Sequence, residues 1–199
     1  MIRLQELGYQ VIDQVFDMEE VEEIIELIES NTKINFNHRN NRGLFAIREF
    51  LHEYPYVLKV LREHRRLKDL IRSFGKDYKV IRSIYFDKPP KANWIVNWLQ
   101  DLTINVKEKI AQPEFKHWRL VDNRVVVQPP KAYLESIITI RIHLDDCDQD
   151  NGALQVIPKS HKNGIVRITD LEGIEKATSE YCEVRKGGVK ERQEKTKKI

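Results

Sequence analysis

The chain has 199 residues and a formal net charge of +3, with 41% hydrophobic and 33% charged residues, the balance of an ordinary globular protein. No apolar run approaches the roughly 20 residues of a membrane span, and the first residues lack the apolar stretch of a signal peptide. Residues 185–199 hold seven basic and two acidic residues, so the rest of the chain has a net charge of −2 and predicts neither a nucleic-acid nor a membrane partner. We expect this basic end to be a solvated extension.

The N-terminal segment predicts a strand followed by a helix. GYQVIDQVF, residues 8–16, has the composition of a short strand. Asp17 then stands as a helix N-cap with the acidic Glu20 three positions later, the pattern of a capping box. Apolar residues recur at helical spacing after it, which predicts an amphipathic helix over 18–30. These apolar residues are Val21, Ile24, Ile25 and Ile28.

The next part of the chain predicts a loop and then more helix. Residues 31–46 are polar and rich in asparagine, which is typical of a loop. Residues 48–74 predict two short helices that are broken at Pro55 and near His64 and end at Gly75.

The second half of the chain predicts strands. Runs rich in β-branched and aromatic residues are separated by turns that contain Pro, Gly, Asp and Asn. The runs are KVIRSIYFD (79–87), WIVNWLQDLTINVKE (94–108), RVVVQ (124–128), SIITIRIHL (136–144) and GALQVI (152–157). Helices first and irregularly spaced strands later predict a mainly β fold with N-terminal helices (α+β), as a sandwich or jelly roll.

One motif in these strands suggests a metal site. His143 and Asp145 stand two residues apart, and side chains two apart on a strand point to the same face. This spacing offers two ligands of a 2-His-1-carboxylate iron site. The opposing interpretation is a histidine at a strand end and an aspartate that forms the turn. A third ligand is hard to place, because the only later histidine is His161, in a Pro-Lys-Ser-His corner.

Three smaller features are also informative. Asp101 is unexpected in a strand, where aspartate is depleted, and is either a strand-end residue or a site carboxylate. Gly187 and Gly188 predict either a tight bend or the beginning of a flexible end. Cys147 and Cys182 are too few for a disulfide framework, which predicts reduced thiols in a cytoplasmic protein.

The chain resembles the phytanoyl-CoA dioxygenase family, which comprises iron(II)- and 2-oxoglutarate-dependent oxygenases with a double-stranded β-helix (jelly-roll) core. The likeness is carried by three segments. They are RSIYFDKPPKANWIVNWLQDLTINVKEKI (82–110), VQPPKAYLESIITIRIHLDDCDQDNGALQVIPKSHKNG (127–164) and VRKGGV (184–189).

The resemblance implies an iron site upstream of the His-Leu-Asp motif. The family's His-x-Asp pair matches Leu99 and Asp101, so the carboxylate ligand is present and the first histidine is replaced by leucine. By the same resemblance, Gln100 and Trp118 match cofactor-binding positions. The family's distal histidine and its 2-oxoglutarate-binding arginine follow G-G-V, whereas here KERQEKTKKI follows Val189 and has no histidine.

We therefore expect one matching metal ligand, Asp101. His143 and Asp145 remain the alternative pair, to be completed by His117 or His161.

The resemblance implies a single oxygenase domain over 1–188, helical over 1–76 and a partial jelly roll over 77–188, with a divergent basic tail at 189–199. The implied cofactors are Fe(II) and 2-oxoglutarate, and the implied reaction is hydroxylation of a small molecule or an acyl-CoA. Since one ligand of three is present, we expect little or no activity and read the change after Gly188 as a frameshift, a fragment or a shortened variant. Exposed strand edges of an incomplete jelly roll would favour self-association.

Two alternatives stay open. One is a non-catalytic binding or scaffold protein that reuses the jelly roll. The other is an active oxygenase that uses His143 and Asp145 as non-standard ligands.

Overall fold

The structure, a computed structural model, describes residues 2–30, 45–75, 78–87, 98–121, 123–165, 178–193 and 198. Its helices are α1 (Ile2–Leu7), α2 (Met18–Ser30), α3 (Phe50–Glu53), α4 (Pro55–Glu63), α5 (Arg65–Ser73), α6 (Lys131–Ser136) and the 3-10 helix η2 (Ser160–Asn163). Its strands are β1 (Tyr9–Ile12), β2 (Phe45–Arg48), β3 (Ile84–Asp87), β4 (Ile104–Val106), β5 (Lys116–Val121), β6 (Arg124–Gln128), β7 (Ile138–Ile142), β8 (Leu154–Val156), β9 (Glu180–Cys182) and β10 (Val189–Gln193).

The capping box at the start of α2 is confirmed. The backbone N–H of Glu20 donates to Asp17 Oδ1 at 3.0 Å, and the backbone N–H of Asp17 donates to Glu20 Oε2 at 2.8 Å. Two N–H groups that the helix itself leaves unpaired are satisfied in this way. The buried face of α2 carries Val21, Ile24 and Ile28, as the helical spacing predicts.

The breaks predicted at Pro55 and near His64 are confirmed, and they separate three helices rather than two. Pro55 begins α4, where its missing N–H breaks no helical hydrogen bond. His64 caps α5, because its Nδ1 accepts a hydrogen bond from the Leu67 N–H at 3.1 Å. The His64 ring stacks on Phe16, with ring centroids 4.1 Å apart, and so ties α5 to the N-terminal segment.

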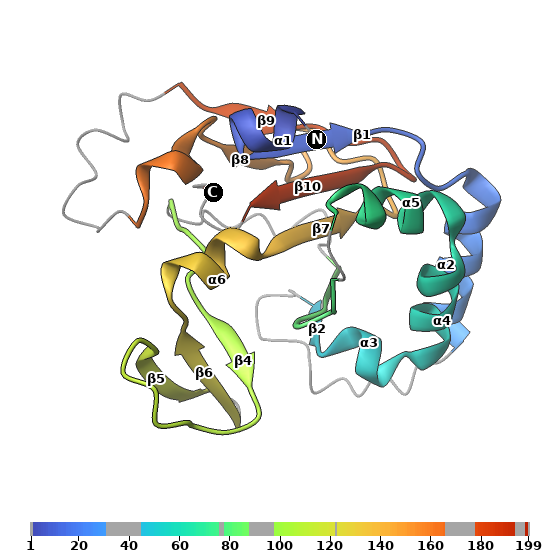
Figure 1. The fold of residues 1–199 in the computed structure, drawn as a ribbon. Coiled ribbons are helices and arrows are strands. Elements are labelled where there is room, and N and C mark those ends of the chain that lie inside the picture. Colours follow the sequence, from blue (N-terminus) through green and yellow to red (C-terminus); the bar gives the residue numbers. More distant parts are fainter. Residues whose placement is uncertain are drawn as a thin grey trace.

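The sheet β1-β10-β7 lies at the centre of the fold, with β10 paired antiparallel to both neighbours. The helices α2, α4 and α5 lie to one side of it (Figure 1). On the face toward the helices, Val189 of β10 and Ile140 and Ile142 of β7 belong to the same apolar cluster as Phe16. Because side chains alternate along a strand, Lys190 and Arg192 point to the opposite face.

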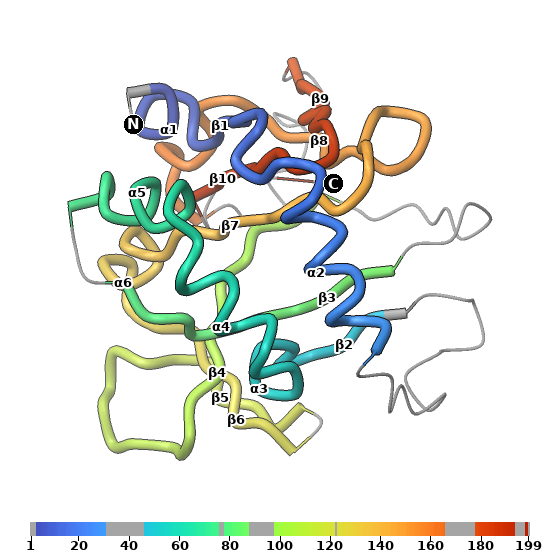
Figure 2. Tube along the Cα trace, turned by 90° about the vertical axis from the view of Figure 1, so that its right-hand side faces the viewer, coloured from blue at the N-terminus to red at the C-terminus, as the bar shows by residue number. Residues whose placement is uncertain are grey.

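The opposite face of this sheet looks toward the β8–β9 pair. Tyr9 of β1, Val156 of β8 and Cys182 of β9 form a second buried cluster between the two. The remaining sheets are β2–β3 and β4-β6-β5, and the latter lies at the other end of the molecule from β8–β9 (Figures 1 and 2). The fold is therefore a mixture of helices and small antiparallel sheets, as the sequence predicts.

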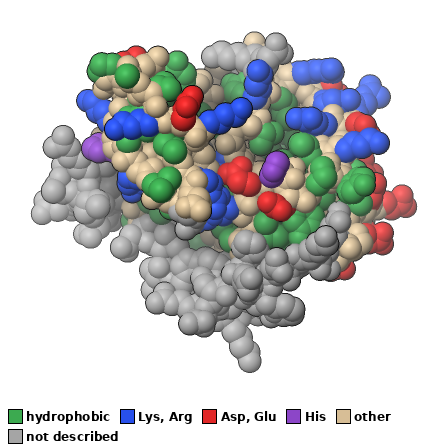
Figure 3. Space-filling model, turned by 90° about the horizontal axis from the view of Figure 1, so that it is seen from below, with side chains coloured by type: hydrophobic (Ala, Val, Ile, Leu, Met, Phe, Trp, Pro, Cys, Tyr) green, Lys and Arg blue, Asp and Glu red, His purple; other side chains and the backbone are tan. Residues whose placement is uncertain are grey.

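The surface shows mixed charge. On the face seen in Figure 3, lysine and arginine side chains are interspersed with acidic and hydrophobic ones rather than gathered in one stripe. Among the described residues, no helix has the length and apolarity needed to cross a membrane. The expected absence of nucleic-acid and membrane partners stays a prediction.

The expectation of a solvated basic extension is wrong for Val189–Gln193. These residues form β10, the middle strand of the central sheet, and its first four residues are buried. Lys190, Glu191 and Arg192 are only 2%, 0% and 3% exposed. The side chains of this segment lack the alternation of apolar and polar residues that is typical of a strand. The strand forms because β1 and β7 pair with its backbone N–H and C=O groups, which are present whatever the side chains are.

A glycine turn sets the register of β10. Gly187 has φ +80, and the backbone N–H of Phe16 donates to its carbonyl at 2.9 Å. A Cβ added at Gly187 would lie 2.3 Å from the Phe16 carbonyl oxygen. The tight-bend interpretation of Gly187-Gly188 is therefore confirmed.

Replacing Gly187 by alanine tests this turn. Alanine is disfavoured at φ +80, and the new Cβ clashes with a backbone oxygen that cannot swing away. We expect Gly187→Ala to lower the free energy of unfolding by about 2–4 kcal/mol in urea denaturation. The matched control is Gly75→Ala, because Gly75 has φ +73 but nothing within 4 Å, and it should lose only about 1 kcal/mol. Equal losses in the two variants would contradict the proposed clash.

Burial perturbs two charges of β10 in opposite directions. Burial is the largest cause that lowers the pKa of Lys190 to about 7, and Arg192 and Arg141 lower it further. Burial likewise raises the pKa of Glu191 to about 7. Neither side chain forms an ion pair within the described residues.

These shifts predict a local minimum of stability near neutral pH. The unfolded lysine keeps its proton up to about pH 10.5 while folded Lys190 loses it near 7, so the free energy of unfolding rises between these values. Folded Glu191 keeps its proton up to about 7 while the unfolded glutamate loses it near 4.5, so the free energy of unfolding falls over that range. Urea titrations at about pH 5, 7 and 9 would measure both slopes.

Lys190→Met should raise the free energy of unfolding at pH 7 and below by several kcal/mol, since each pKa unit corresponds to about 1.4 kcal/mol. The rise above pH 7 should disappear in this variant. Lys131→Met is the control, because Lys131 is exposed on α6. A pH profile unchanged by Lys190→Met would contradict the burial of a charged group there.

Candidate functional site

Asp101 is the centre of a cluster of ion pairs. Its Oδ2 accepts hydrogen bonds from Arg192 Nη2 and from Lys198 Nζ. The Arg192 side chain is almost fully buried, and Asp101 and Lys198 are each about one-fifth exposed. The second terminal nitrogen of Arg192, Nη1, donates to the Gln193 carbonyl at 3.1 Å. A carboxylate withdrawn from water needs a counter-charge, and here two cations supply it.

Backbone pairing brings Lys198 to this position. The N–H of Leu99 donates to the Lys198 carbonyl at 2.9 Å, and the N–H of Lys198 donates to the Leu99 carbonyl at 3.0 Å. Asp101 follows Leu99 by two residues, so positions 99, 101 and 198 form one group from segments far apart in the sequence. Lys198 also bridges to Val156 of β8, which places the group beside the β8–β9 pair.

The two cations control the ionisation of Asp101. Burial alone would raise the pKa of this carboxyl group, but Arg192 and Lys198 outweigh burial and hold the pKa below its ordinary value. Asp101 is therefore an anion throughout the neutral pH range, with both of its charge partners within hydrogen-bonding distance.

The surroundings of this group are basic. Arg141 of β7 lies opposite Lys190 in the sheet register, on the same face as Arg192. Cys182 of β9 is the thiol beside Lys190: burial raises its pKa and Lys190 opposes the rise. Four basic side chains thus accompany Asp101 on the inner face of the central sheet. They are Arg141, Lys190, Arg192 and Lys198.

His143 and Asp145 do not form the expected pair on one face. The strand β7 ends at Ile142, so the alternation that would align the two side chains stops before them. His143 is buried, and burial, followed by neighbouring basic side chains, lowers its pKa to about 3. Asp145 is exposed and acts electrostatically on Tyr85, on the helix side of the sheet. The turn interpretation of this motif fits the structure.

The two other histidines considered as ligands lie elsewhere. His161 is buried in η2, and its Nε2 lies 3.1 Å from the carbonyl oxygen of Gln5 at the N-terminal helix. His117 is exposed on β5 and has φ +54. Neither of them, nor His143, belongs to a group of three or more His, Cys, Asp or Glu side chains within the described ranges.

Gln100 and Trp118 take part in local hydrogen bonds. Gln100 Nε2 donates to the Gly164 carbonyl at 2.9 Å, which ties the Asp101 segment to the turn after η2. Trp118 Nε1 donates to the Phe115 carbonyl at 3.0 Å. Their cofactor-binding roles stay predictions.

Comparison with known proteins agrees with this fold. The family described as phytanoyl-CoA dioxygenase (PhyH) matches residues 4–190. The chain belongs to this family. A curated relative, a probable alpha-ketoglutarate-dependent hypophosphite dioxygenase from Stutzerimonas stutzeri, is 25% identical over 189 residues. That match covers 88% of this chain but only 55% of the relative, so the chain spans little more than half of the relative's length.

Solved structures of the same fold belong to related enzymes. The alpha-ketoglutarate-dependent carbocyclase SnoK from nogalamycin biosynthesis has a TM-score of 0.71 at 14% identity, over 99% of this chain and 74% of SnoK. EctD from S. alaskensis has a TM-score of 0.60 at 15% identity, over 99% and 68% of the two chains. HygX from Streptomyces hygroscopicus, solved with nickel and 2-oxoglutarate, has a TM-score of 0.58 at 14% identity, over 98% and 76%. These matches confirm the jelly-roll fold of the chain.

The described residues of this PhyH protein do not fit an iron centre. Leucine at position 99 has no donor atom, and Arg192 and Lys198 meet the Asp101 carboxylate as cations rather than as lone-pair donors. A divalent cation at this carboxylate would face two positive side chains within a few ångström. This site therefore offers a metal ion one ligand, the Asp101 carboxylate, and two positive side chains that compete with the metal ion for that carboxylate.

Arg192 and Lys198 are the residues that the sequence analysis missed. Both stand in the basic stretch expected to be solvated. One signal could have found them: an aspartate inside the apolar segment WLQDLTI must meet a positive partner when it is buried, whether a metal ion or a side chain.

Substitution of Asp101 distinguishes a metal ion from positively charged side chains as the partner of its carboxylate. In an empty metal site, neutralising a ligand carboxylate relieves repulsion, whereas here Asp101→Asn removes the negative charge that two cations contact. We therefore expect Asp101→Asn to lower the free energy of unfolding by about 3 kcal/mol at pH 7. The difference should shrink as the pH falls below about 3.8, the ordinary pKa, because the wild-type carboxylate then protonates as well.

The matched control is Asp69→Asn. Asp69 pairs with Arg65 and Arg72 on the exposed surface of α5 and should change stability by about 0.5 kcal/mol or less. If Asp101→Asn is neutral or stabilising, the ion pairs do not hold this region together.

Proposed function

We propose that this chain, in the form described, is a PhyH family protein without dioxygenase activity. The reaction expected from the family resemblance is Fe(II)- and 2-oxoglutarate-dependent hydroxylation of a small molecule or an acyl-CoA. The observation that carries the proposal is the pairing of Asp101 with Arg192 and Lys198. Such a chain would act by binding rather than by catalysis, which is the remaining use of a pre-formed jelly roll.

The physical basis is coordination chemistry. A 2-His-1-carboxylate centre holds iron with three protein ligands and leaves the other positions open for co-substrate and oxygen. Here one carboxylate is present, and its Oδ2 already accepts two charge-assisted hydrogen bonds. Iron binding at Asp101 would have to displace both cations from the carboxylate that they contact.

An active oxygenase with His143 as a ligand is the competing function. The pKa of His143 is about 3, so its ring is neutral at pH 7 and one ring nitrogen has a lone pair that can bind a metal ion. The same pKa reflects burial next to Arg141 and Lys190, and a positive environment opposes a second cation. The structure therefore favours the non-catalytic reading over this one.

An anaerobic titration with Fe(II) and 2-oxoglutarate tests the proposal. We expect no stoichiometric binding in the micromolar range, no visible charge-transfer absorption, and no succinate produced when oxygen is admitted. A tight one-to-one complex would overturn the proposal, and its loss in His143→Ala would then identify the alternative ligand. EctD, whose structure was solved with 2-oxoglutarate and 5-hydroxyectoine, can serve as the positive control.

A variant with new metal ligands tests whether positions 99, 101 and 198 are close enough to bind one metal ion. Leu99→His together with Lys198→His puts two imidazoles beside Asp101, and Arg192→Leu removes the remaining competing cation. We expect this triple variant to bind Co(II) or Ni(II) with a Kd in the micromolar range, by calorimetry. Adding Asp101→Ala should abolish that binding, and Leu99→His alone should bind weakly. A folded triple variant that binds no metal would show that positions 99, 101 and 198 are not the metal-ligand positions of the fold.

A further inference from the structure

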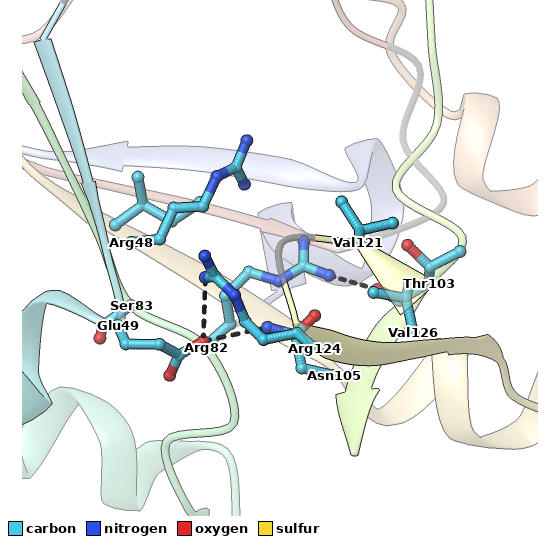
Figure 4. A pocket seen from close by; sticks show the side chains of 10 residues that line it. Arg48, Glu49, Arg82, Ser83, Thr103, Asn105, Val121, Arg124 and Val126 are labelled. Atoms are coloured by element: carbon cyan, nitrogen blue, oxygen red, sulfur yellow. Dashed lines mark hydrogen bonds and ion pairs between the residues drawn. The ribbon is translucent and has the colours of Figure 1, made fainter. Parts of the chain in front are cut away.

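A second site lies away from Asp101. A cavity of about 170 Å³ opens between the β2–β3 pair and the β4-β6-β5 sheet (Figure 4). Three arginines line it: Arg48 at the end of β2, Arg82 just before β3 and Arg124 at the start of β6. The acidic side chain among the lining residues is Glu49, and the amide of Asn105 from β4 lies beside it.

The polar side chains of the cavity are held in place by hydrogen bonds. Arg82 Nη2 donates to the Thr103 carbonyl at 2.6 Å, which orients its guanidinium group. Asn105 Nδ2 donates to Glu49 Oε1 at 3.0 Å, and Arg124 Nη1 lies 3.7 Å from the same oxygen. Side chains from four different strands or their ends thus meet at one place, as Figure 4 shows.

The backbone at Glu49 is unusual. Glu49 has φ +55 and ψ +32, the left-handed region that residues other than glycine rarely adopt. It stands between β2 and α3, where its backbone carbonyl accepts hydrogen bonds from the His52 and Glu53 N–H groups. Strained conformations of this kind cluster at functional sites, and Glu49 lines the arginine-rich cavity from this conformation.

The charge of the cavity identifies its ligand. Among the described residues that line the cavity, three guanidinium groups and one carboxylate give a formal charge of +2, and like charges gathered in one cavity repel each other. A dianion would offset this charge, whereas a single carboxylate would offset only half of it. We propose that the cavity binds the phosphate group of a small phosphorylated molecule. A phosphate carries about −1.5 to −2 charge at pH 7, and its oxygens match the planar fork of arginine.

The size of the cavity agrees with this ligand. A volume of about 170 Å³ is large enough for a phosphate group together with water. The apolar side of the cavity, formed by Val121 and Val126, can contact the carbon atoms next to the phosphate. The proposal does not depend on whether Asp101 binds a metal, since none of the arginines belongs to that cluster.

Calorimetry at low ionic strength tests the proposal with four probes. Inorganic phosphate and phenyl phosphate distinguish the free ion from an esterified group, and saturable binding of either supports the site. Acetate and succinate are the comparison anions, and we expect both to bind more weakly than the phosphates. Arg82→Gln and Arg124→Gln should each weaken phosphate binding by about tenfold or more. Arg119→Gln is the matched control, because Arg119 is exposed on β5 and should leave the affinity unchanged.

A substitution that is expected to strengthen phosphate binding controls for the effect of folding defects. Glu49→Gln keeps the shape of the side chain and raises the charge of the cavity from +2 to +3, so it should tighten phosphate binding several-fold. A damaged fold cannot produce tighter binding. The proposal fails if neither phosphate saturates, if succinate binds more tightly than both, if Arg119→Gln weakens binding as much as Arg82→Gln, or if Glu49→Gln does not strengthen it.

Discussion

The contact of Asp101 with Arg192 and Lys198 is the constraint on which the interior of this protein depends. It joins the segment before β4 to Arg192 of β10 and to Lys198, which lie 91 and 97 residues later in the sequence. A buried carboxylate without a partner would be strongly destabilising, and so would a buried guanidinium. Each charge is tolerable inside the jelly roll only because the others are there. The carboxylate to which the family resemblance assigns a metal is thus paired here with the protein's own positive charges.

The central strand β10 connects this site to the helical core. Val189 packs with the helices on one face, and Arg192 reaches Asp101 on the other, so the register of one strand sets both. Gly187 fixes that register through its contact with Phe16. The burial of Lys190 and Glu191 opposes the formation of this strand, and backbone hydrogen bonds to β1 and β7 outweigh that cost. A change in the register of β10 would therefore alter both the packing of Val189 in the core and the contact of Arg192 with Asp101.

The sequence predicts the elements whose local chemistry agrees with the fold. The capping box at Asp17, the apolar spacing of α2 and the breaks at Pro55 and His64 are local signals, and the structure has each of them. The strand β10 could not be predicted, because VKERQ carries no period-two apolar pattern and its backbone pairs with strands more than 40 residues away. The family resemblance predicts a carboxylate ligand at Asp101 and a leucine in place of the first histidine at Leu99. It could not show that lysine and arginine would meet the carboxylate, since only the folded chain brings them there.

Arg192 and Lys198 bring the same positive charge to Asp101 as a divalent metal ion would. A ferrous ion brings two positive charges to a carboxylate, and Arg192 and Lys198 together also bring two. A bound metal stabilises a fold only in proportion to its free concentration and affinity, whereas side chains tethered to the same chain are present at a high effective concentration. Guanidinium and ammonium groups match the charge of the metal but have no open coordination position for a co-substrate. Under the proposed function, this arrangement keeps the charge of Asp101 balanced without a metal ion, and the proposed phosphate site in the arginine-lined cavity carries the binding function.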